Sequence, residues 1–225
     1  MTTQSLASPA NGLRTRARVS LPRGTRGVRC TAWQWSPHHS APYVLAYDYA
    51  CPRGQSPDAC RDGARFLTTV LITDIVDSTA TATRMGDRRW RDLLADHYSA
   101  CRAHVSRNAG ALVNTTGDGI VATFDSPAHA VRAAIAIQAM ARKSGIAVRA
   151  GLHTGECERL EDGVAGLTVH IAARVCALGG ADAVVATTTV RDLANGSMLA
   201  FEPRGHHDLK GVPGRWAVFS ATESV

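Results

Sequence analysis

Two short apolar segments with a glycine-containing turn between them constrain the fold most. Residues 111–115 and 120–124 are separated by Thr-Gly-Asp-Gly, and Gly-Asp-Gly between apolar strands is typical of a β-hairpin. The hairpin is preceded by a strand and a helix and is followed by a helix and a strand. We therefore expect the order β-α-β-β-α-β, a ferredoxin-like α+β core, followed by a C-terminal α/β extension.

Hydrophobic periodicity places the individual elements. Residues 66–72 are a β-branched apolar run, which predicts a buried strand, whereas residues 87–110 repeat apolar positions at helical spacing. Ser126 and Pro127 supply an N-cap and a first-turn proline for the next helix. The remaining expected elements are a helix at 127–143, a strand at 146–152, a polar loop at 157–166, a helix at 168–178, a strand at 183–186, a helix at 188–194 and strands at 199–202 and 217–221.

Charge divides the chain into two regions. The whole chain has a net charge of +6 and a pI near 9.3. Residues 1–64 contain eight arginines and three acids, whereas residues 65–225 contain 17 basic and 16 acidic residues. The nearly neutral second region carries no electrostatic footprint for DNA or RNA, so we expect no nucleic-acid partner there.

Residues 1–64 show no clear periodicity, and we interpret them as an Arg-rich, disordered N-terminal extension. Two alternatives are an organelle transit peptide, which is typically rich in Arg and Ser and poor in acids, and a translation start placed too far upstream. A further hypothesis gives this basic segment affinity for a membrane surface or a nucleic acid. Residues 65–225 are expected to form the functional domain.

Hydropathy and cysteine usage indicate the compartment. No apolar run approaches the roughly 20 residues that a membrane-spanning helix needs. None of the six cysteines forms a CxxC pair, and Cys101 and Cys176 fall on probable buried helix faces. We therefore expect a reduced, cytoplasmic protein without a membrane span.

A carboxylate and a polar turn follow the first strand. Asp74 ends the strand, and Val76, Asp77, Ser78 and Thr79 form a turn that opens a helix. Such a turn directs backbone N–H groups and the positive end of a helix to one place, which suits phosphate. Carboxylate oxygens suit a hard divalent cation.

The second carboxylate, Asp118, lies at the tip of the hairpin. In a ferredoxin-like sheet the first strand lies beside the third, so Asp74 and Asp118 should be neighbours in space. Two carboxylates beside an anion-binding turn predict a metal–phosphate site. Taken singly, each acid also has a structural reading, because Asp-x-x-Ser is a common helix-capping pattern and Asp is a common turn residue.

Four segments in register resemble the class III nucleotidyl cyclases, and are most similar to actinobacterial soluble cyclase domains. They are ITDIVDST, NTTGDG, GLTVHIAARV and DLKGVPGRW. The resemblance implies that Asp74, Asp118 and the backbone carbonyl of Ile75 hold two Mg²⁺ or Mn²⁺ ions. It implies attack of the ribose 3′-hydroxyl on the α-phosphate of ATP, which yields 3′,5′-cyclic AMP and pyrophosphate.

The same resemblance assigns roles to residues beyond the carboxylates. Arg174 would stabilise charge on the α-phosphate, and His170, where the family usually has Asn, would orient the ribose. Lys210 would contact the triphosphate. The family places its two active sites between two subunits, so a homodimer is implied. On the residues alone, His170 and Arg174 fit a solvent-facing helix and Lys210 fits a surface turn.

The sequence departs from the family at the positions that select the base. Asn114 and Gly163 match neither the adenine-selecting pair nor the guanine-selecting pair, and Asp162 could substitute after a shift of one residue. Asp77 stands where many relatives have Gly. The function predicted is therefore an adenylate cyclase, with two alternatives: a guanylate cyclase, or a weakly active or inactive cyclase-like module that binds nucleotide and dimerises for regulation.

Overall fold

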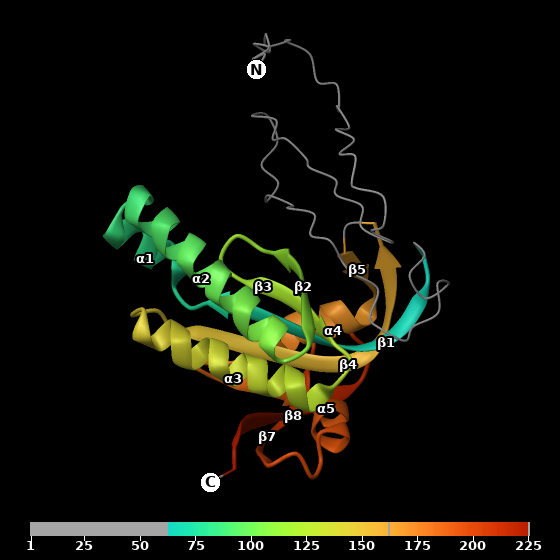
Figure 1. Ribbon diagram of the computed structural model, residues 1–225. Helices are drawn as coiled ribbons and strands as arrows, with labels where there is room; N and C mark the ends of the chain where they lie inside the picture. Colours follow the sequence, from blue (N-terminus) through green and yellow to red (C-terminus); the bar gives the residue numbers. More distant parts are fainter. Residues whose placement is uncertain (1–62, 162, 225) are drawn as a thin grey trace, which may run out of the picture.

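The computed structural model describes residues 63–161 and 163–224, so the basic segment and Asp162 lie outside the described part. The described residues form thirteen elements (Figure 1). In chain order these are β1 (Arg65–Ile75), α1 (Ser78–Met85), α2 (Asp87–Arg107), β2 (Gly110–Thr115), β3 (Ile120–Phe124), α3 (Pro127–Lys143), β4 (Val148–Leu160), β5 (Gly163–Ala165), α4 (Leu167–Ala177), β6 (Val184–Thr187), α5 (Thr188–Leu193), β7 (Leu199–Asp208) and β8 (Arg215–Glu223).

One sheet runs through the described domain in the order β2-β3-β1-β4-β6-β8-β7, with β5 paired to β4. The first four strands are antiparallel, and β1 lies between β3 and β4. This arrangement confirms the ferredoxin-like core and the adjacency of the first and third strands. The C-terminal extension continues the same sheet through the parallel pair β4–β6 and the hairpin β7–β8.

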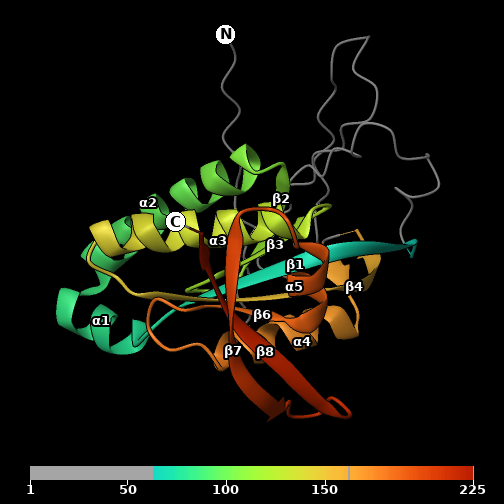
Figure 2. The same ribbon diagram turned by 90° about the horizontal axis from the view of Figure 1, so that it is seen from below.

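Helices cover both faces of the sheet. In Figures 1 and 2, α2 and α3 lie side by side over one face, and α4 lies on the other. Successive side chains of β1 point to opposite faces of the sheet, so alternate residues pack in different hydrophobic clusters. Leu71 and Ile75 pack with residues of α2 and α3, whereas Val70 packs with Ala172 of α4. Asp74 lies one residue before Ile75 and so faces the α4 side.

Two glycines let α4 lie against β4. A Cβ added at Gly151 would come within 2.1 Å of the Cys176 backbone nitrogen, and one at Gly155 would lie 2.6 Å from the Thr168 hydroxyl oxygen. Backbone of the helix therefore touches backbone of the strand. Thr168 also donates a hydrogen bond to the Glu156 carbonyl, at 2.7 Å. The position of α4 over the sheet is thus fixed at two points along β4.

Several expectations from the sequence need correction. The predicted loop at 157–166 is instead the end of β4 and the short strand β5, which pair as a hairpin. The strand expected at 146–152 begins at Val148, and β7 and β8 are both longer than expected. The helix that the polar turn is expected to open is α1, which ends at Met85 because its C-cap, Gly86, has a φ of 82°.

Buried cysteines agree with the expected reduced core. The described cysteines Cys101, Cys157 and Cys176 are free and buried. Burial raises the pKa of both Cys101 and Cys176 to about 12, so these thiols stay protonated. Within residues 63–161 and 163–224, no helix is both long and apolar enough to cross a membrane.

Candidate active site

The Asp118 hairpin is attached to the end of β1 by two hydrogen bonds and a close backbone approach. The Ile75 N–H donates to the Asp118 carbonyl at 3.2 Å, and the Ile120 N–H donates to the Thr73 hydroxyl at 3.2 Å. A Cβ at Gly119 would lie 1.8 Å from the Thr73 carbonyl oxygen, so only glycine permits this approach. The predicted proximity of the two carboxylates is confirmed, and the second glycine of the turn is what allows it.

The charge of Asp118 acts on the neighbouring Asp74 carboxyl. Burial raises the pKa of Asp74 above its usual 3.8, and the nearby Asp118 charge raises it further. A hydrogen bond and the charge of Arg149 act in the opposite direction. A pair of oxygen-donor side chains that repel each other suits a hard divalent cation, so the residues fit the metals that the family resemblance implies.

The donor set around such an ion is small. Among the described residues there is no group of three or more His, Cys, Asp and Glu side chains arranged to hold a metal. A cation here would therefore depend on Asp74, Asp118 and backbone oxygen, for which the Ile75 carbonyl is the predicted source. The remaining ligands would come from water and from a bound phosphate.

Arg149 is a site residue that the sequence analysis missed. It stands opposite Asp74 in the β1–β4 register, and its Nε and Nη2 lie 2.7 and 2.5 Å from Asp74 Oδ2. Both side chains are about one-third exposed. Only the register of the two strands reveals this pair, because 75 positions separate the two residues in the chain.

The predicted phosphate turn has a distinctive backbone. Asp77 is the N-cap of α1 in the left-handed region, with φ 53° and ψ 37°, and its side chain makes no capping hydrogen bond. This left-handed conformation favours glycine, and Asp is among the few other residue types that adopt it. The Val76 N–H donates to the Ala147 carbonyl at 2.9 Å, so the N–H groups available to a ligand begin further into the turn.

Ser78 links this turn to the second carboxylate. Its hydroxyl donates to Asp118 Oδ2 at 2.5 Å. A charge-assisted bond of this length fixes the rotation of the carboxylate. Ser78 and Thr79 keep their predicted position at the first turn of α1, with Thr79 exposed and Ser78 half-buried. The turn and the hairpin thus form one connected unit.

The helix α4 presents the second predicted group of residues. His170 and Arg174 are exposed and lie four residues apart, on the face of α4 that points away from the sheet. The loop between β7 and β8 packs against the same helix, since Leu209 and Val212 share a core with Ile171 and Val175. Lys210 stands in this loop with its side chain exposed. Arg174 and Lys210 therefore lie on the same side of the sheet as Asp74.

The two predicted base-specifying positions come close together. A β-bulge in β2 lies between Leu112 and Asn114, and a Cβ at Gly163 of β5 would lie 3.2 Å from Val113. The Asn114 side-chain oxygen accepts a hydrogen bond from the Thr115 N–H at 2.7 Å. Its amide N–H groups are therefore free to donate to a ligand, and the oxygen keeps one further acceptor position. Asp162, the proposed substitute, lies outside the described residues.

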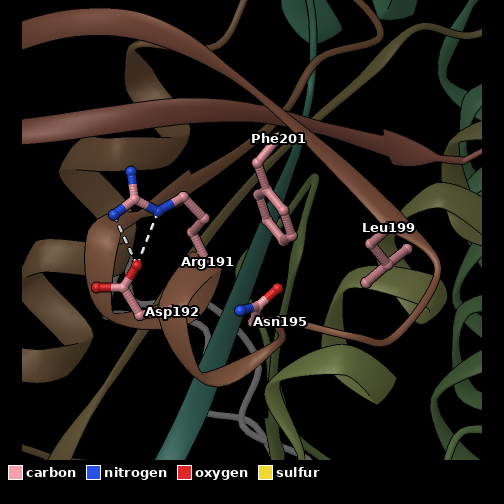
Figure 3. Close-up of a pocket in the computed structure, with 5 residues that line it drawn as sticks. All are labelled: Arg191, Asp192, Asn195, Leu199 and Phe201. Atoms are coloured by element: carbon pink, nitrogen blue, oxygen red, sulfur yellow. Dashed lines mark hydrogen bonds and ion pairs between the residues drawn. The ribbon is translucent and has the colours of Figure 1, made fainter.

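A separate pocket lies between α5 and β7 and contains none of the predicted residues. It has a volume of about 380 Å³. Figure 3 shows Arg191 and Asp192 paired at its rim, with Nη2 and Oδ1 2.6 Å apart. Arg191 also stacks on Phe219, so its charge is used within the fold. The lining residues are Arg191, Asp192, Asn195, Leu199 and Phe201.

Comparison with known proteins identifies the family. Residues 67–221 match the family described as the adenylate and guanylate cyclase catalytic domain, and the chain belongs to it. An uncharacterized protein of Mycobacterium tuberculosis is 30% identical over 124 residues, which cover 54% of this chain and 33% of that protein. The chain therefore spans about a third of the length of this curated relative.

Solved structures share the fold. The guanylyl cyclase Cya2 superposes with a TM-score of 0.67 at 19% identity, covering 73% of this chain and 96% of that chain. The adenylyl cyclase CyaB from P. aeruginosa gives 0.64 at 17% identity, covering 73% and 98%. At these identities the likeness concerns the architecture, and cyclases of both base specificities have it.

Proposed function

We propose that this protein is an adenylate cyclase that converts ATP to 3′,5′-cyclic AMP and pyrophosphate. The observation that carries the proposal is the junction of Asp74 and Asp118 at the end of β1, in a chain of the cyclase family. Divalent cations, Mg²⁺ or Mn²⁺, when bound there, would supply Lewis-acid activation of the 3′-hydroxyl and neutralise the triphosphate. Asp74, Asp118 and the Ile75 carbonyl would hold them.

The other residues position and neutralise the substrate. Backbone N–H groups of the α1 turn, at Ser78 and Thr79, would contact phosphate oxygens at the positive helix end. Lys210 would bind the triphosphate as a point charge, and Arg174 would give the α-phosphate a planar, bidentate donor. His170 would hold the ribose. This division leaves catalysis to positioning and charge stabilisation, as is usual for phosphoryl transfer.

Adenine selection rests on the amide of Asn114. Because its oxygen already accepts from the Thr115 N–H, Asn114 would contact the base mainly through its amide N–H donors, and the adenine N1 atom is an acceptor whereas guanine N1 carries a proton. This supports ATP over GTP at that contact. A guanylate cyclase remains the second candidate, because a donor also fits the guanine O6 atom. Initial rates with ATP and with GTP decide between the two.

The proposed active form is a homodimer with two shared sites. His170 and Arg174 face away from their own sheet, and Leu167, in the first turn of the same helix, is 53% exposed. A second copy placed on this face would cover Leu167 and bring Arg174 to the partner's carboxylates. The protein would act in the reduced cytoplasm, in cyclic-nucleotide signalling.

Mixing two inactive variants tests the shared site. Asp118→Ala and Arg174→Ala should each lack activity alone. Random exchange of subunits should restore about a quarter of the wild-type rate, because half of the dimers then contain one intact site. No recovery after verified subunit exchange would contradict a site built from two chains. Recovery without exchange would be equally contradictory.

Two observations favour the regulatory module as an alternative. Arg149 is already paired with Asp74, and the base-selecting positions depart from the family. A protein of this kind would bind ATP and form a dimer but release no cyclic product with Mn²⁺. Calorimetric binding of a non-hydrolysable ATP analogue, together with a product assay, distinguishes this module from the enzyme.

A further inference from the structure

We propose that Tyr98 is a positioning residue for the Asp118 hairpin. Its hydroxyl holds the Gly117 carbonyl and thereby sets the direction in which Asp118 presents its carboxylate. The consequence for metal binding rests on the proposed function, whereas the anchoring of the hairpin does not. Tyr98 belongs to α2, an element to which the site described above assigns no residue.

The contact itself is direct. The Tyr98 hydroxyl donates to the Gly117 carbonyl oxygen at 2.7 Å, across 19 positions of the chain. The ring is half-buried against the core beneath α2, and it lies beside the buried His97 with ring centroids 6.1 Å apart. His97 is in turn held by Cys101, with Nε2 3.4 Å from Sγ. A ring fixed in this way carries its hydroxyl to a defined point.

Asp118 lies between two peptide groups that are each tied to a different element. Its own carbonyl accepts from Ile75 of β1, and the preceding carbonyl, that of Gly117, accepts from Tyr98 of α2. The turn is also closed by the Thr116 N–H, which donates to the Gly119 carbonyl at 2.9 Å. Fixing the peptide groups on both sides of a residue limits its backbone rotation and so directs its side chain.

The hydrogen bond from Tyr98 restrains a backbone position, Gly117, that has no side chain of its own to restrain it. Gly117 has a φ of +88°, and a Cβ placed there would meet no atom within 4 Å. The residue is therefore free of steric restraint from neighbours and adopts a conformation that few other residues share. Without the Tyr98 bond, the peptide group that precedes Asp118 would have no side-chain restraint at its carbonyl.

The hydroxyl remains a donor over the working pH range. Burial, reinforced by the nearby charge of Asp118, raises the pKa of Tyr98 to about 12. An uncharged phenol beside an acidic carboxylate keeps its proton and can donate a hydrogen bond to a carbonyl. The contact is thus not expected to change between pH 6 and pH 9.

The test compares Tyr98→Phe with a matched control, Thr68→Val, in the full chain. Tyr98→Phe deletes one oxygen atom. Thr68→Val deletes a hydroxyl that likewise donates to a backbone carbonyl, that of Phe124, at 3.1 Å in the same sheet. Two quantities are measured: hydrogen exchange of the hairpin amides at 116–120, and Mn²⁺ affinity without nucleotide, by the electron paramagnetic resonance signal of free Mn²⁺.

Tyr98→Phe should exchange the hairpin amides about fivefold faster, as expected for loss of one hydrogen bond. Its Mn²⁺ affinity should fall about tenfold, the low end for the loss of a group that orients a metal ligand. Thr68→Val should change neither quantity. Unchanged exchange in Tyr98→Phe would overturn the anchoring, and faster exchange with unchanged Mn²⁺ affinity would overturn the positioning role.

The two proposals fail in different ways. A wild-type protein that binds no Mn²⁺ would contradict the proposed metal site. The hydrogen exchange of the amides at 116–120 would still test whether Tyr98 anchors the hairpin. Equal effects of Thr68→Val and Tyr98→Phe would show a general loosening of the sheet and would overturn the specific role of Tyr98.

Discussion

Adding a single methyl group at Gly119 should separate the hairpin from β1. The new Cβ in Gly119→Ala would lie 1.8 Å from the Thr73 carbonyl oxygen and 2.8 Å from its carbonyl carbon. Both atoms belong to the backbone of a central strand and cannot rotate away as a side chain would. The hairpin must therefore move, and the bonds from Ile75 to Asp118 and from Ile120 to Thr73 would lengthen with it.

The size of the effect follows from these contacts. Overpacking costs about 1–3 kcal/mol, and weakening two hydrogen bonds adds about 1 kcal/mol. We therefore expect the free energy of unfolding to fall by about 2–4 kcal/mol, which corresponds to a Tm lowered by roughly 5–15 °C. Cyclase activity should fall further than stability explains, because Asp118 moves away from Asp74.

The matched control is Gly180→Ala. A Cβ at Gly180 would meet no atom within 4 Å, and its φ lies outside the left-handed region. Urea unfolding of the two variants and the wild type gives the comparison, and only Gly119→Ala should be destabilised. Equal stability of Gly119→Ala and Gly180→Ala would refute the close approach of the hairpin to β1.

Three further predictions concern charge and packing. Burial raises the Asp74 pKa, and the hydrogen bond and charge of Arg149 limit that rise by stabilising the ionised carboxylate. Arg149→Met should therefore destabilise the protein more at pH 7, where Asp74 is ionised, than at pH 3, where it is protonated; pH-dependent urea unfolding measures this. Burial lowers the pKa values of His97 and His153 to about 4, so between pH 6.5 and 4 the unfolded chain binds protons that the folded protein does not. The free energy of unfolding should therefore fall over this range, and replacing either histidine by a residue that does not titrate should make the fall with pH less steep. Gly151→Ala places a Cβ 2.1 Å from a backbone nitrogen of α4, so it should lower both Tm and activity, and an unchanged melting curve would contradict the packing of α4 on β4.

The placement of the two carboxylates could be predicted because it depends on topology. Once β1 is followed by a helix and a hairpin, the strand order puts Asp74 beside Asp118. The hairpin itself can be predicted because its signal, Gly-Asp-Gly between two apolar segments, lies in adjacent residues. The same holds for the Ser126 cap, whose hydroxyl oxygen accepts from the His129 N–H.

Features that depend on strand register and on packing could not be predicted in this way. The Asp74–Arg149 pair exists only for one register of β1 against β4, and a shift of one residue would place Arg149 on the other face. The 157–166 segment looked like a loop because Arg159 and several other polar residues interrupt it. In the fold Arg159 stacks on Phe66, with its guanidinium carbon 4.3 Å from the ring centroid, and the strand continues.

Side-chain contacts between residues far apart in the chain could not be predicted from the sequence either. Tyr98 occupies an ordinary apolar position of a helix, and only its three-dimensional neighbour, Gly117, gives it a further role. Ser78 was assigned to the phosphate turn from its sequence position, but its hydroxyl points to Asp118. A side chain's direction depends on packing that residue spacing alone does not specify.

The most direct test of the central claim is a product assay with the full-length protein. ATP and GTP would be supplied separately, each with Mn²⁺ and with Mg²⁺, and the cyclic nucleotides quantified beside an Asp118→Ala control of unchanged fold. We predict cyclic AMP from ATP well above the control, with less product from GTP. Absence of both cyclic nucleotides from a folded dimer, or equal product from Asp118→Ala, would contradict the account.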